Sequence, residues 1–319
     1  MKLIRSWQPL ALQAGRKRNN QSRGVLTIGN FDGMHQGHRT ILTSVIEKAR
    51  DQGLLSQVML FEPQPLEFFA PDKAPARLMT CREKLEVLQS LDIDEVYCPH
   101  FNREFANLSA EDFVSKLLVD ACGVSEVIVG DDFCFGRQRA GNFHFLAQAG
   151  KAQGFKVTRT DSVLSGSDRI SSTFIRQLLE QDQFEHAGKL LGRPFTFSGR
   201  VVRGEQRGRQ LGFPTANILL NRKVMPLEGV FAVEVSVGQG TPYYGVANVG
   251  SRPTIHQTEP RIWLEVHLFD FSGDLYQQRL VVRVRKKFRS EQKFASLSAL
   301  QQAIGEDVAK AKAFFAAQS

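Results

Sequence analysis

The segment Gly29–His38, with the sequence GNFDGMHQGH, constrains the fold more than any other part of this chain. It follows the apolar run Val25–Ile28 and precedes the amphipathic segment Arg39–Arg50. A strand, a glycine-rich turn and a helix in this order predict a βα unit, and the helix N-terminus at such a turn attracts anions. We therefore predict a turn that holds a triphosphate and has positive φ angles at its glycines, Gly29, Gly33 and Gly37.

Two histidines in this turn, His35 and His38, are three residues apart and are expected to face the same phosphate groups. Such a pair suits the stabilisation of charge on a phosphate under attack. Two other interpretations stay open: glycine-rich turns follow strands in many α/β proteins, and neighbouring histidines can simply cap a helix. A structural zinc site has little support, because no cysteine and no glutamate of an HExxH motif stands beside the histidines at ligand spacing.

The first half of the chain alternates short apolar runs with helical patterns, which predicts a parallel sheet with helices on both faces. Ligands of such sheets bind at the carboxyl ends of the strands, where the glycine-rich turn lies. The expected strands are 25–28, 57–61, 95–98, 126–130 and 155–158. The expected helix Ala110–Cys122 has Ser109 as its N-cap, Asp112 completing a capping box, and a buried face of Phe113, Leu117 and Leu118.

After Pro194 the sequence changes to short β-rich segments with Gly and Pro between them, which predicts a small antiparallel barrel. The expected strands are 195–202, 230–237, 243–249, 262–269 and 280–284, and a final helix is expected over 297–315. With 319 residues, the chain is long enough for two domains. We predict a Rossmann-like domain over 1–186 and a barrel domain over 187–319.

The net charge of +8 indicates an anionic partner, which can be nucleic acid, a membrane surface or a phosphate-bearing small molecule. The basic stretch Arg279–Lys293 favours none of these strongly, because Val282 and Val284 alternate with its basic residues as in a half-buried strand. The four cysteines form no CxxC pair and are expected to be reduced, buried thiols. Without a long apolar segment, the protein is expected to be cytoplasmic.

Three further stretches are expected near the first site. Ile170–Arg176 offers hydroxyls and an arginine at a helix start, as in a phosphate site, although an ordinary N-cap with a surface arginine explains it equally well. Gly130–Gly136 ends a strand, and its Phe133 and Phe135 can flank a planar ring or belong to the core. In Phe61–Pro65 the prolines predict a rigid turn at the rim of the site.

A second centre is expected in Gly208–Asn217, where Thr215 and Asn217 place two neutral oxygens on one side of an extended segment. Such oxygens suit Mg²⁺ that arrives with a nucleotide. If this centre transfers a phosphoryl group to a hydroxyl, Glu265 is the candidate base, because it lies within an apolar strand beside His267. The alternative, an outward-facing glutamate on an alternating strand, is equally compatible with the sequence.

With these motifs in place, the chain resembles the prokaryotic bifunctional riboflavin kinase/FMN adenylyltransferase family, often called FAD synthetase. The resemblance covers almost the whole chain and rests on GNFDGMHQGH (29–38), FEPQP (61–65), GDDFCFG (130–136), ISSTFIR (170–176), GRQLGFPTAN (208–217), GVFAVEV (229–235), NVGSRPT (248–254) and LEVHLFD (264–270). It implies that riboflavin and ATP give FMN in the C-terminal domain, and that FMN and ATP give FAD and pyrophosphate in the N-terminal domain, both with Mg²⁺. It also implies no nucleic-acid or membrane partner, and we expect a monomer or weak oligomer.

The resemblance also implies roles for single residues. For the kinase step they are Glu265 as base, Thr215 and Asn217 for Mg²⁺ and the ATP phosphates, and Gly208 and Arg209 in a mobile loop over the nucleotide. For adenylyl transfer they are His35 and His38 as stabilisers of charge, with Gly29, Asn30, Phe31, Gly33, Gly37, Ser172, Thr173 and Arg176 for ATP. Flavin contacts are implied for Phe61, Pro63, Asp132, Phe133, Phe135, Gly229 and Phe231, the last of which replaces the tyrosine that is frequent in the family.

Two competing hypotheses remain at this point. The first is a nucleotidyltransferase that modifies RNA and uses the basic barrel as an RNA-binding module, which the net charge suggests. The PTAN and LEVHLFD motifs argue against it. The second is an enzyme with a single activity, in which one of the two centres is degenerate and the barrel only binds flavin.

Overall fold

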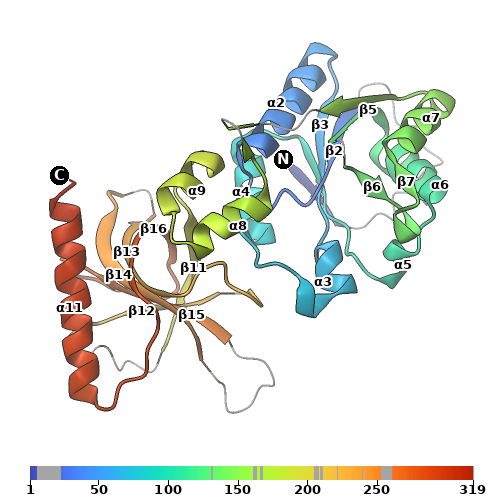
Figure 1. Ribbon diagram of the computed structural model, residues 1–319. Coiled ribbons are helices and arrows are strands. Elements are labelled where there is room, and N and C mark those ends of the chain that lie inside the picture. Colours follow the sequence, from blue (N-terminus) through green and yellow to red (C-terminus); the bar gives the residue numbers. More distant parts are fainter. Residues whose placement is uncertain are drawn as a thin grey trace. The chain divides into compact units, whose positions relative to one another are not determined.

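The computed structural model describes residues 1–5, 23–130, 132–160, 164–165, 168–204, 208, 211–220, 222–238, 240–252 and 261–318. Contacts divide the chain into two compact units, each described by itself below (Figure 1). The first unit comprises Met1–Pro75 and Cys81–Ser171, and the second comprises Ala76–Thr80 and Ser172–Ser319.

The first unit is built on a six-stranded parallel sheet with the order β1-β4-β3-β2-β5-β8. Its strands are β1 (Lys2–Ile4), β2 (Gly24–Ile28), β3 (Leu55–Met59), β4 (Glu95–Tyr97), β5 (Val124–Gly130) and β8 (Lys156–Thr160). Its main helices are α2 (Gln36–Asp51), α4 (Cys81–Ser90), α6 (Ala110–Asp112), the π-helix η3 (Phe113–Cys122) and α7 (Phe143–Gln153). Shorter elements are α3 (Pro65–Phe69), η2 (Pro71–Lys73), α5 (Arg103–Ala106), η4 (Arg137–Arg139), and the strand pairs β6 (Cys134–Phe135) with β7 (Gly141–Asn142) and β9 (Leu164–Ser165) with β10 (Asp168–Arg169).

Helices cover both faces of this sheet, as predicted. On one face, Val25 and Ile128 of the sheet pack with Val45 of α2. On the other face, Leu26 and Val127 belong to the core that contains most of η3. Neighbouring residues of β2 and β5 thus point to opposite cores, which is why these strands are apolar throughout.

The predicted helix after Ser109 differs from the structure in one respect. The Ser109 hydroxyl accepts a hydrogen bond from the Asp112 amide (3.0 Å), so the predicted N-cap is confirmed. After Asp112, however, the chain continues as the π-helix η3. Sequence spacing does not separate the two helix types here, because Phe113 and Leu117 are buried on one face in either.

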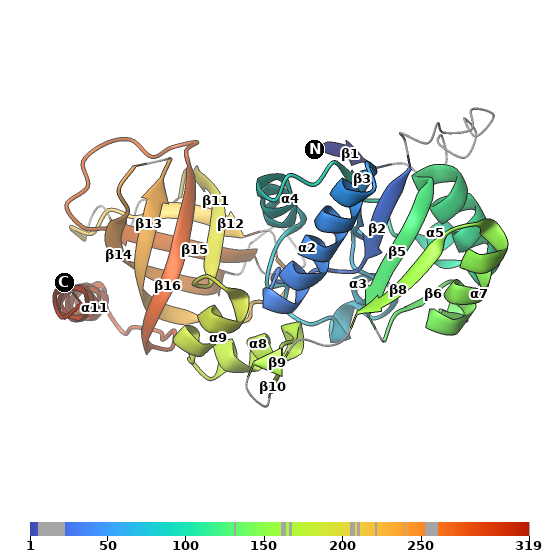
Figure 2. The ribbon, with the colours of Figure 1, turned by 90° about the horizontal axis from the view of Figure 1, so that it is seen from above.

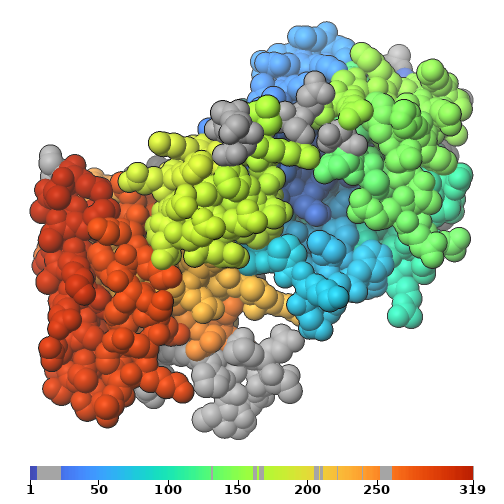
Figure 3. Space-filling view, viewed as in Figure 1, coloured from blue at the N-terminus to red at the C-terminus, as the bar shows by residue number. Residues whose placement is uncertain are grey.

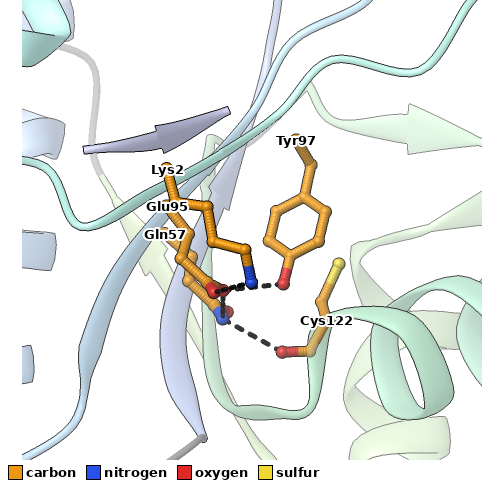
Figure 4. A network of polar contacts seen from close by, with 5 residues as sticks. All are labelled: Lys2, Gln57, Glu95, Tyr97 and Cys122. Carbon is orange, nitrogen blue, oxygen red and sulfur yellow. Dashed lines mark hydrogen bonds and ion pairs between the residues drawn. The ribbon is translucent and has the colours of Figure 1, made fainter. Parts of the chain in front are cut away.

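A buried polar network fastens the edge strand β1 to the sheet (Figure 4). Glu95 accepts hydrogen bonds from the Tyr97 hydroxyl (2.8 Å) and from Gln57 Nε2 (3.0 Å). Lys2 Nζ lies 3.5 Å from the other oxygen of Glu95, and Gln57 Nε2 also donates to the Cys122 carbonyl (3.0 Å). A carboxylate that is 6% exposed is thereby satisfied within the sheet.

The second unit is a closed barrel of six antiparallel strands, with the order β11-β12-β15-β14-β13-β16 (Figure 2). The strands are β11 (Thr196–Val202), β12 (Ala216–Leu220), β13 (Gly229–Val237), β14 (Tyr243–Arg252), β15 (Arg261–Leu268) and β16 (Arg279–Arg289). The helices are α8 (Ser172–Glu180), α9 (Phe184–Leu191) and α11 (Leu297–Ala316). The barrel and the terminal helix are confirmed, but β12 was not predicted, because it follows directly on a Gly- and Pro-containing motif.

The outer face of the barrel is partly covered by α11. Val230 and Val246 of the barrel form one cluster with Ala311 and Phe315 of this helix. In the space-filling view, α11 and the barrel form one continuous orange and red surface (Figure 3).

Basic residues of β16 form ion pairs and hydrogen bonds with acidic residues of the second unit. Arg285 forms an ion pair with Glu234, and Lys287 lies 3.2 Å from Asp182. Arg289 donates two hydrogen bonds to the buried Asp307. The predicted half-buried strand is confirmed, and its basic face is taken up largely by internal pairs, which weakens the RNA-binding hypothesis.

In the part of the chain that is described, no helix combines the length and apolar character needed to cross a bilayer. All four cysteines are free thiols, as predicted. Cys98 and Cys122 are buried, whereas Cys81 and Cys134 are only partly buried.

Candidate functional site

The glycine-rich turn leaves the sheet at its topological switch point. The chain passes from β2 to β3 and then to β4 on one side, and returns to β5 on the other side of β2. Parallel sheets bind ligands in the crevice outside the carboxyl ends of the strands at such a point. The turn from Gly29 to His35 begins at the carboxyl end of β2, so the predicted placement of this motif is confirmed.

The backbone of the turn is contorted, but only partly at the residues predicted. Of its three glycines only Gly33 has a positive φ (85°), whereas Phe31 (46°) and Met34 (44°) also adopt the left-handed region. Gly37 lies instead in the first turn of α2. A Cβ at Gly29 would come 3.1 Å from the Phe31 ring. Because Phe31 and Met34 are almost fully buried, packing holds them in a conformation that costs energy for non-glycine residues.

His35 is the N-cap of α2. Its Nδ1 accepts a hydrogen bond from the His38 amide (3.2 Å). Nδ1 is therefore unprotonated, and the proton of the neutral ring is on Nε2. The two imidazoles stack with 3.6 Å between their centroids and 15° between their planes. The helix-capping interpretation is thus correct for His35, and capping fixes which nitrogen of this ring can donate to a ligand.

His38 is held as a neutral ring. Desolvation, the neighbouring His35 and then the positive charge of Lys84 keep the pKa of His38 well below its ordinary value. Among the described residues, its buried Nδ1 atom has no hydrogen-bond partner. At neutral pH this ring acts as a hydrogen-bonding group without a charge of its own.

Lys84 is a residue of this region that sequence analysis missed. It lies on α4 and is 2% exposed, although lysine is seldom fully buried. Its Nζ donates a hydrogen bond to the Asn30 carbonyl (2.7 Å), which ties α4 to the turn. The spacing of four residues to the buried Leu88 was the signal that this lysine faces inward.

The aromatic candidates at the strand ends divide into packed and accessible rings. Phe135 is 6% exposed and belongs to the core, as the core interpretation predicts. Phe133 is only partly buried and stacks on Phe135 at 5.4 Å and 21°. Phe61 is also partly buried and packs at 5.8 Å from Phe101.

The polar and proline candidates of the first unit are close in sequence to these rings. Asp132 is exposed and forms an ion pair with Arg169 (3.6 Å). Pro63 follows the aromatic Phe61 at the end of β3 and is joined to Glu62 by a cis peptide bond. Both residues therefore lie in loops that follow carboxyl ends of the sheet.

The ISSTFIR segment begins helix α8, which belongs to the second unit. Ser172 is its first residue, and Thr173 is exposed. The Arg176 Nε donates to the carbonyl of Ala76 (2.5 Å), a residue of the same unit. This bond holds a part-buried arginine at the end of the short segment 76–80.

Three candidate kinase residues come together on the outer face of the barrel. Asn217 of β12 is directly opposite Glu265 of β15 in the strand register, so both side chains point to the same side. Asn217 is 6% exposed, and its Nδ2 donates to the Thr215 carbonyl (3.2 Å). A Cβ at Gly204 would lie 2.6 Å from the Asn217 side chain, so glycine leaves room for this amide.

Glu265 lies on the face of β15 that points away from the barrel core. The strand alternates strictly, with Leu264 and Val266 buried and Glu265 half-buried. The outward-facing alternative is therefore correct in geometry. The face is structured, however, since His267 Nδ1 lies 2.9 Å from the Pro214 carbonyl and its ring packs edge-on to Phe213 (5.6 Å).

The other candidates of the second unit are distributed as follows. Gly208 is described and accepts a hydrogen bond from the Phe213 amide (2.8 Å), whereas Arg209 lies outside the described residues. Gly229 has a φ of 123°, and a Cβ there would overlap the Arg289 carbonyl. Phe231 is fully buried with its ring 5.9 Å from Phe184, which favours a packing role.

The residues around Asn217 fit a metal ion that arrives with a nucleotide. The Asn217 amide nitrogen donates a hydrogen bond to the Thr215 carbonyl. The oxygens that could coordinate a metal ion are therefore the Oδ1 of Asn217 and the hydroxyl of Thr215. Neutral oxygens in small number suit a cation that keeps waters and phosphate ligands. Among the described residues, no three His, Cys, Asp or Glu side chains are grouped as a metal site.

Two family models match successive parts of the chain. Residues 17–174 match the family model described as FAD synthetase, and residues 191–315 match that described as riboflavin kinase. The bifunctional riboflavin kinase/FMN adenylyltransferase of Escherichia coli K12 is 50% identical over 316 residues, covering 99% of this chain and 98% of that protein. The protein of the same description from Pseudomonas fluorescens is 49% identical over 293 residues, covering 92% and 93%.

A solved structure supports the same fold. The crystal structure of a protein described as a macrolide-efflux protein from Streptococcus pneumoniae has a TM-score of 0.75 and 30% sequence identity. The similarity covers 96% of each chain.

Proposed function

This chain belongs to the bifunctional riboflavin kinase/FMN adenylyltransferase family, and we propose on that premise how its residues carry the two reactions. The protein phosphorylates riboflavin with ATP to give FMN, and transfers the adenylyl group of a second ATP to FMN to give FAD and pyrophosphate. We assign adenylyl transfer to residues 1–186 and the kinase reaction to residues 187–319.

In adenylyl transfer, a phosphate oxygen of FMN attacks the α-phosphorus of ATP. A P–O bond forms to FMN while the bond to the β-phosphate oxygen breaks and pyrophosphate leaves. Because the FMN phosphate is already ionised, no protein base is required. The chain supplies hydrogen-bond donors: we assign His35 Nε2 and His38 to the charge that develops on the α-phosphate, next to the N-terminus of α2.

The remaining ATP and flavin contacts of this reaction are assigned from the resemblance to the family. The turn residues Gly29, Asn30, Phe31, Gly33 and Gly37 are assigned to the nucleotide, and Ser172, Thr173 and Arg176 to the phosphates that leave. Partly buried rings with an accessible side suit the planar flavin. The flavin contacts are therefore Phe61 and Phe133, backed by Phe135 and flanked by Pro63 and Asp132.

In the kinase reaction, Glu265 accepts the proton of the riboflavin 5′-hydroxyl as its oxygen bonds to the γ-phosphorus of ATP, and ADP leaves. The observation that carries this assignment is the register of β12 and β15, which sets Asn217 directly beside Glu265. The proposed base, Glu265, and the residue assigned to the ATP phosphates, Asn217, are thereby on neighbouring strands, which are about 4.8 Å apart. Gly208 and Arg209 are assigned to the loop over the nucleotide, and Gly229 and Phe231 to the strand that supports the flavin.

ATP is used with a metal ion in both families, and we propose that the ion is Mg²⁺. Thr215 and Asn217 would hold it in the kinase centre together with the ATP phosphates. When bound, it neutralises phosphate charge during transfer.

The two activities are tested with ATP labelled at different phosphates. Label in the γ-phosphate should enter FMN, and label in the α-phosphate should enter FAD, when the protein is incubated with riboflavin, ATP and Mg²⁺ and the flavins are separated by chromatography. EDTA should abolish both products. Failure of either label to reach its flavin would overturn the corresponding activity.

We further propose that the protein acts in the cytoplasm, as a monomer or weak oligomer, and without a nucleic-acid partner. Four free thiols suit a reducing compartment. The internal pairing of Arg285, Lys287 and Arg289 leaves little of β16 to bind a phosphate backbone. Sedimentation of the purified protein, with and without RNA, tests the last two points.

A further inference from the structure

Three polar residues form a row across neighbouring strands on the outer face of the barrel. Glu265 of β15 is directly opposite Asn217 of β12 on one side and directly opposite Asn248 of β14 on the other. Directly opposed residues of antiparallel strands point to the same side of the sheet. The carboxylate therefore lies between two amides, of which only Asn217 has a role so far.

The Asn248 amide is held in a fixed orientation. Its Nδ2 donates a hydrogen bond to Glu291 Oε1 (3.1 Å). Its Oδ1 is buried, and among the described residues it has no hydrogen-bond partner. A Cβ at Gly250 would overlap the Glu291 carboxylate, so glycine at this position permits the Glu291 contact. A buried acceptor without a partner is unfavourable, which indicates that a ligand donor satisfies it.

The order of these three residues indicates in which direction the ribityl chain of the substrate extends from Glu265. The phosphate donor lies on the Asn217 side, where Thr215 and Gly208 are also found. The other direction along β15, beyond His267, is filled by Pro214 and Phe213. The carbon chain that bears the reacting hydroxyl therefore extends from Glu265 toward Asn248.

We propose that Asn248 is a specificity residue of the kinase reaction, whose Oδ1 accepts a hydrogen bond from a second hydroxyl of the ribityl chain. Glu291 is its positioning residue, because it holds the amide nitrogen and leaves the oxygen for the substrate. One strand spacing, about 4.8 Å, is comparable to the distance from the 5′-oxygen to the hydroxyls one or two carbons further along the chain. This inference rests on the proposed role of Glu265 as the base.

The test combines substrate analogues with variants. Riboflavin and its 2′-, 3′- and 4′-deoxy analogues are phosphorylated by the full-length protein and by Asn248→Ala, and kcat/KM is measured for each. We expect the wild-type protein to discriminate against one deoxy analogue by about tenfold or more, and Asn248→Ala to lose that discrimination. If Asn248→Ala keeps the full discrimination against every deoxy analogue, the proposal is overturned.

Three further measurements separate this result from trivial causes. Adenylyl transfer from added FMN should be unchanged in Asn248→Ala, and hydrogen exchange of the β15 amides at the wild-type rate shows that the barrel is folded. Glu291→Gln retains an acceptor and should keep the discrimination, whereas Glu291→Ala should weaken it. The exposed amide variant Gln302→Ala on α11 is the matched control and should behave as wild type in every assay.

The outcome is also distinguishable from failure of the proposed function. Glu265→Gln should lower kcat for riboflavin and for all three analogues alike. If Glu265→Gln retains normal kcat, the base assignment fails. Loss of discrimination in Asn248→Ala alone would still locate the ribityl chain at Asn248.

Discussion

The two sites that we propose for ATP contain opposite kinds of side chain. In the parallel-sheet unit, two stacked imidazoles stand at a helix N-terminus, and the pKa of His38 is held low by desolvation, by His35 and by Lys84. In the barrel unit, a carboxylate and two amides lie in a row across three strands. The difference follows the nucleophile: a phosphate attacks without losing a proton, whereas an alcohol must lose one.

The two sites also differ in how they are fixed. The first depends on a contorted turn, where Phe31 and Met34 keep positive φ angles because they are buried. The second depends on strand register, which sets Asn217 beside Glu265 without unusual backbone. We therefore expect the first site to be sensitive to packing, and the second to the chemistry of single side chains.

The largest effect is expected from removal of the proposed base. Glu265→Gln keeps the size of the side chain but cannot accept the hydroxyl proton, so we expect kcat of FMN formation to fall by about 10²- to 10⁴-fold. FAD formation from added FMN should be unchanged. The exposed Glu306→Gln on α11 is the matched control. Equal loss of both activities in Glu265→Gln would contradict two separate sites.

The converse experiment removes an imidazole. We expect His38→Ala to lower the rate of FMN-to-FAD conversion by about 10²- to 10³-fold, because a donor to the developing charge is lost. Riboflavin phosphorylation should continue at the wild-type rate. His144→Ala, an exposed histidine of the same unit, serves as control. An unchanged adenylyl transfer rate in His38→Ala would show that the imidazole is not part of the mechanism.

The fold was largely predictable, because its signals are local. Periodicity of apolar residues located the five expected strands of the parallel sheet and the helix that begins after Ser109. In the barrel, however, β12 was missed because its signal is merged with the motif that ends at Asn217. Positive φ angles at Phe31 and Met34 were also missed, since burial rather than residue type stabilises them.

The candidate sites were predictable only as separate motifs. Sequence placed Asn217 and Glu265 in the same domain, but their opposition depends on strand pairing between distant segments. The same is true of Asn248, which no local signal connects with Glu265. Lys84 was missed because a lysine in a helix is ordinarily exposed.

A smaller effect is expected from Lys84→Met, which tests whether the charge of Lys84 helps to keep His38 neutral in the first site. Removal of the positive charge should raise the pKa of His38 toward its ordinary value, and loss of the bond to the Asn30 carbonyl should lower adenylyl transfer by about tenfold. Titration of the His38 ring protons by NMR measures the first effect directly. Lys151→Met, at the end of α7, is the control, and a His38 pKa that does not move in Lys84→Met would contradict this account.

The smallest effect is expected on the stability of the parallel sheet that carries the first site, and the stability of the barrel should not change. Glu126 of β5 is almost fully buried, and its Oε1 lies 2.5 Å from Lys48 Nζ. Burial raises the pKa of Glu126, but hydrogen bonds from Lys48 and Thr158 and the nearby charges of Lys48 and Lys156 outweigh it and lower the pKa below 4.5. A carboxyl group whose pKa is lowered by folding stabilises the folded state above that unfolded value, and this contribution is lost as pH falls through the folded pKa.

Lys48→Met should therefore lower the opening free energy of the β5 amides by about 1–3 kcal/mol at pH 7, measured by hydrogen exchange. The difference from wild type should shrink only as pH falls through the lowered pKa of Glu126, because the carboxyl group then becomes protonated in both proteins. Lys116→Met removes an exposed pair with Asp112 and should cost less than about 0.5 kcal/mol. Because the β15 amides lie in the other unit, their exchange should stay at the wild-type rate, and a matching loss of protection there would show that the two units do not open independently.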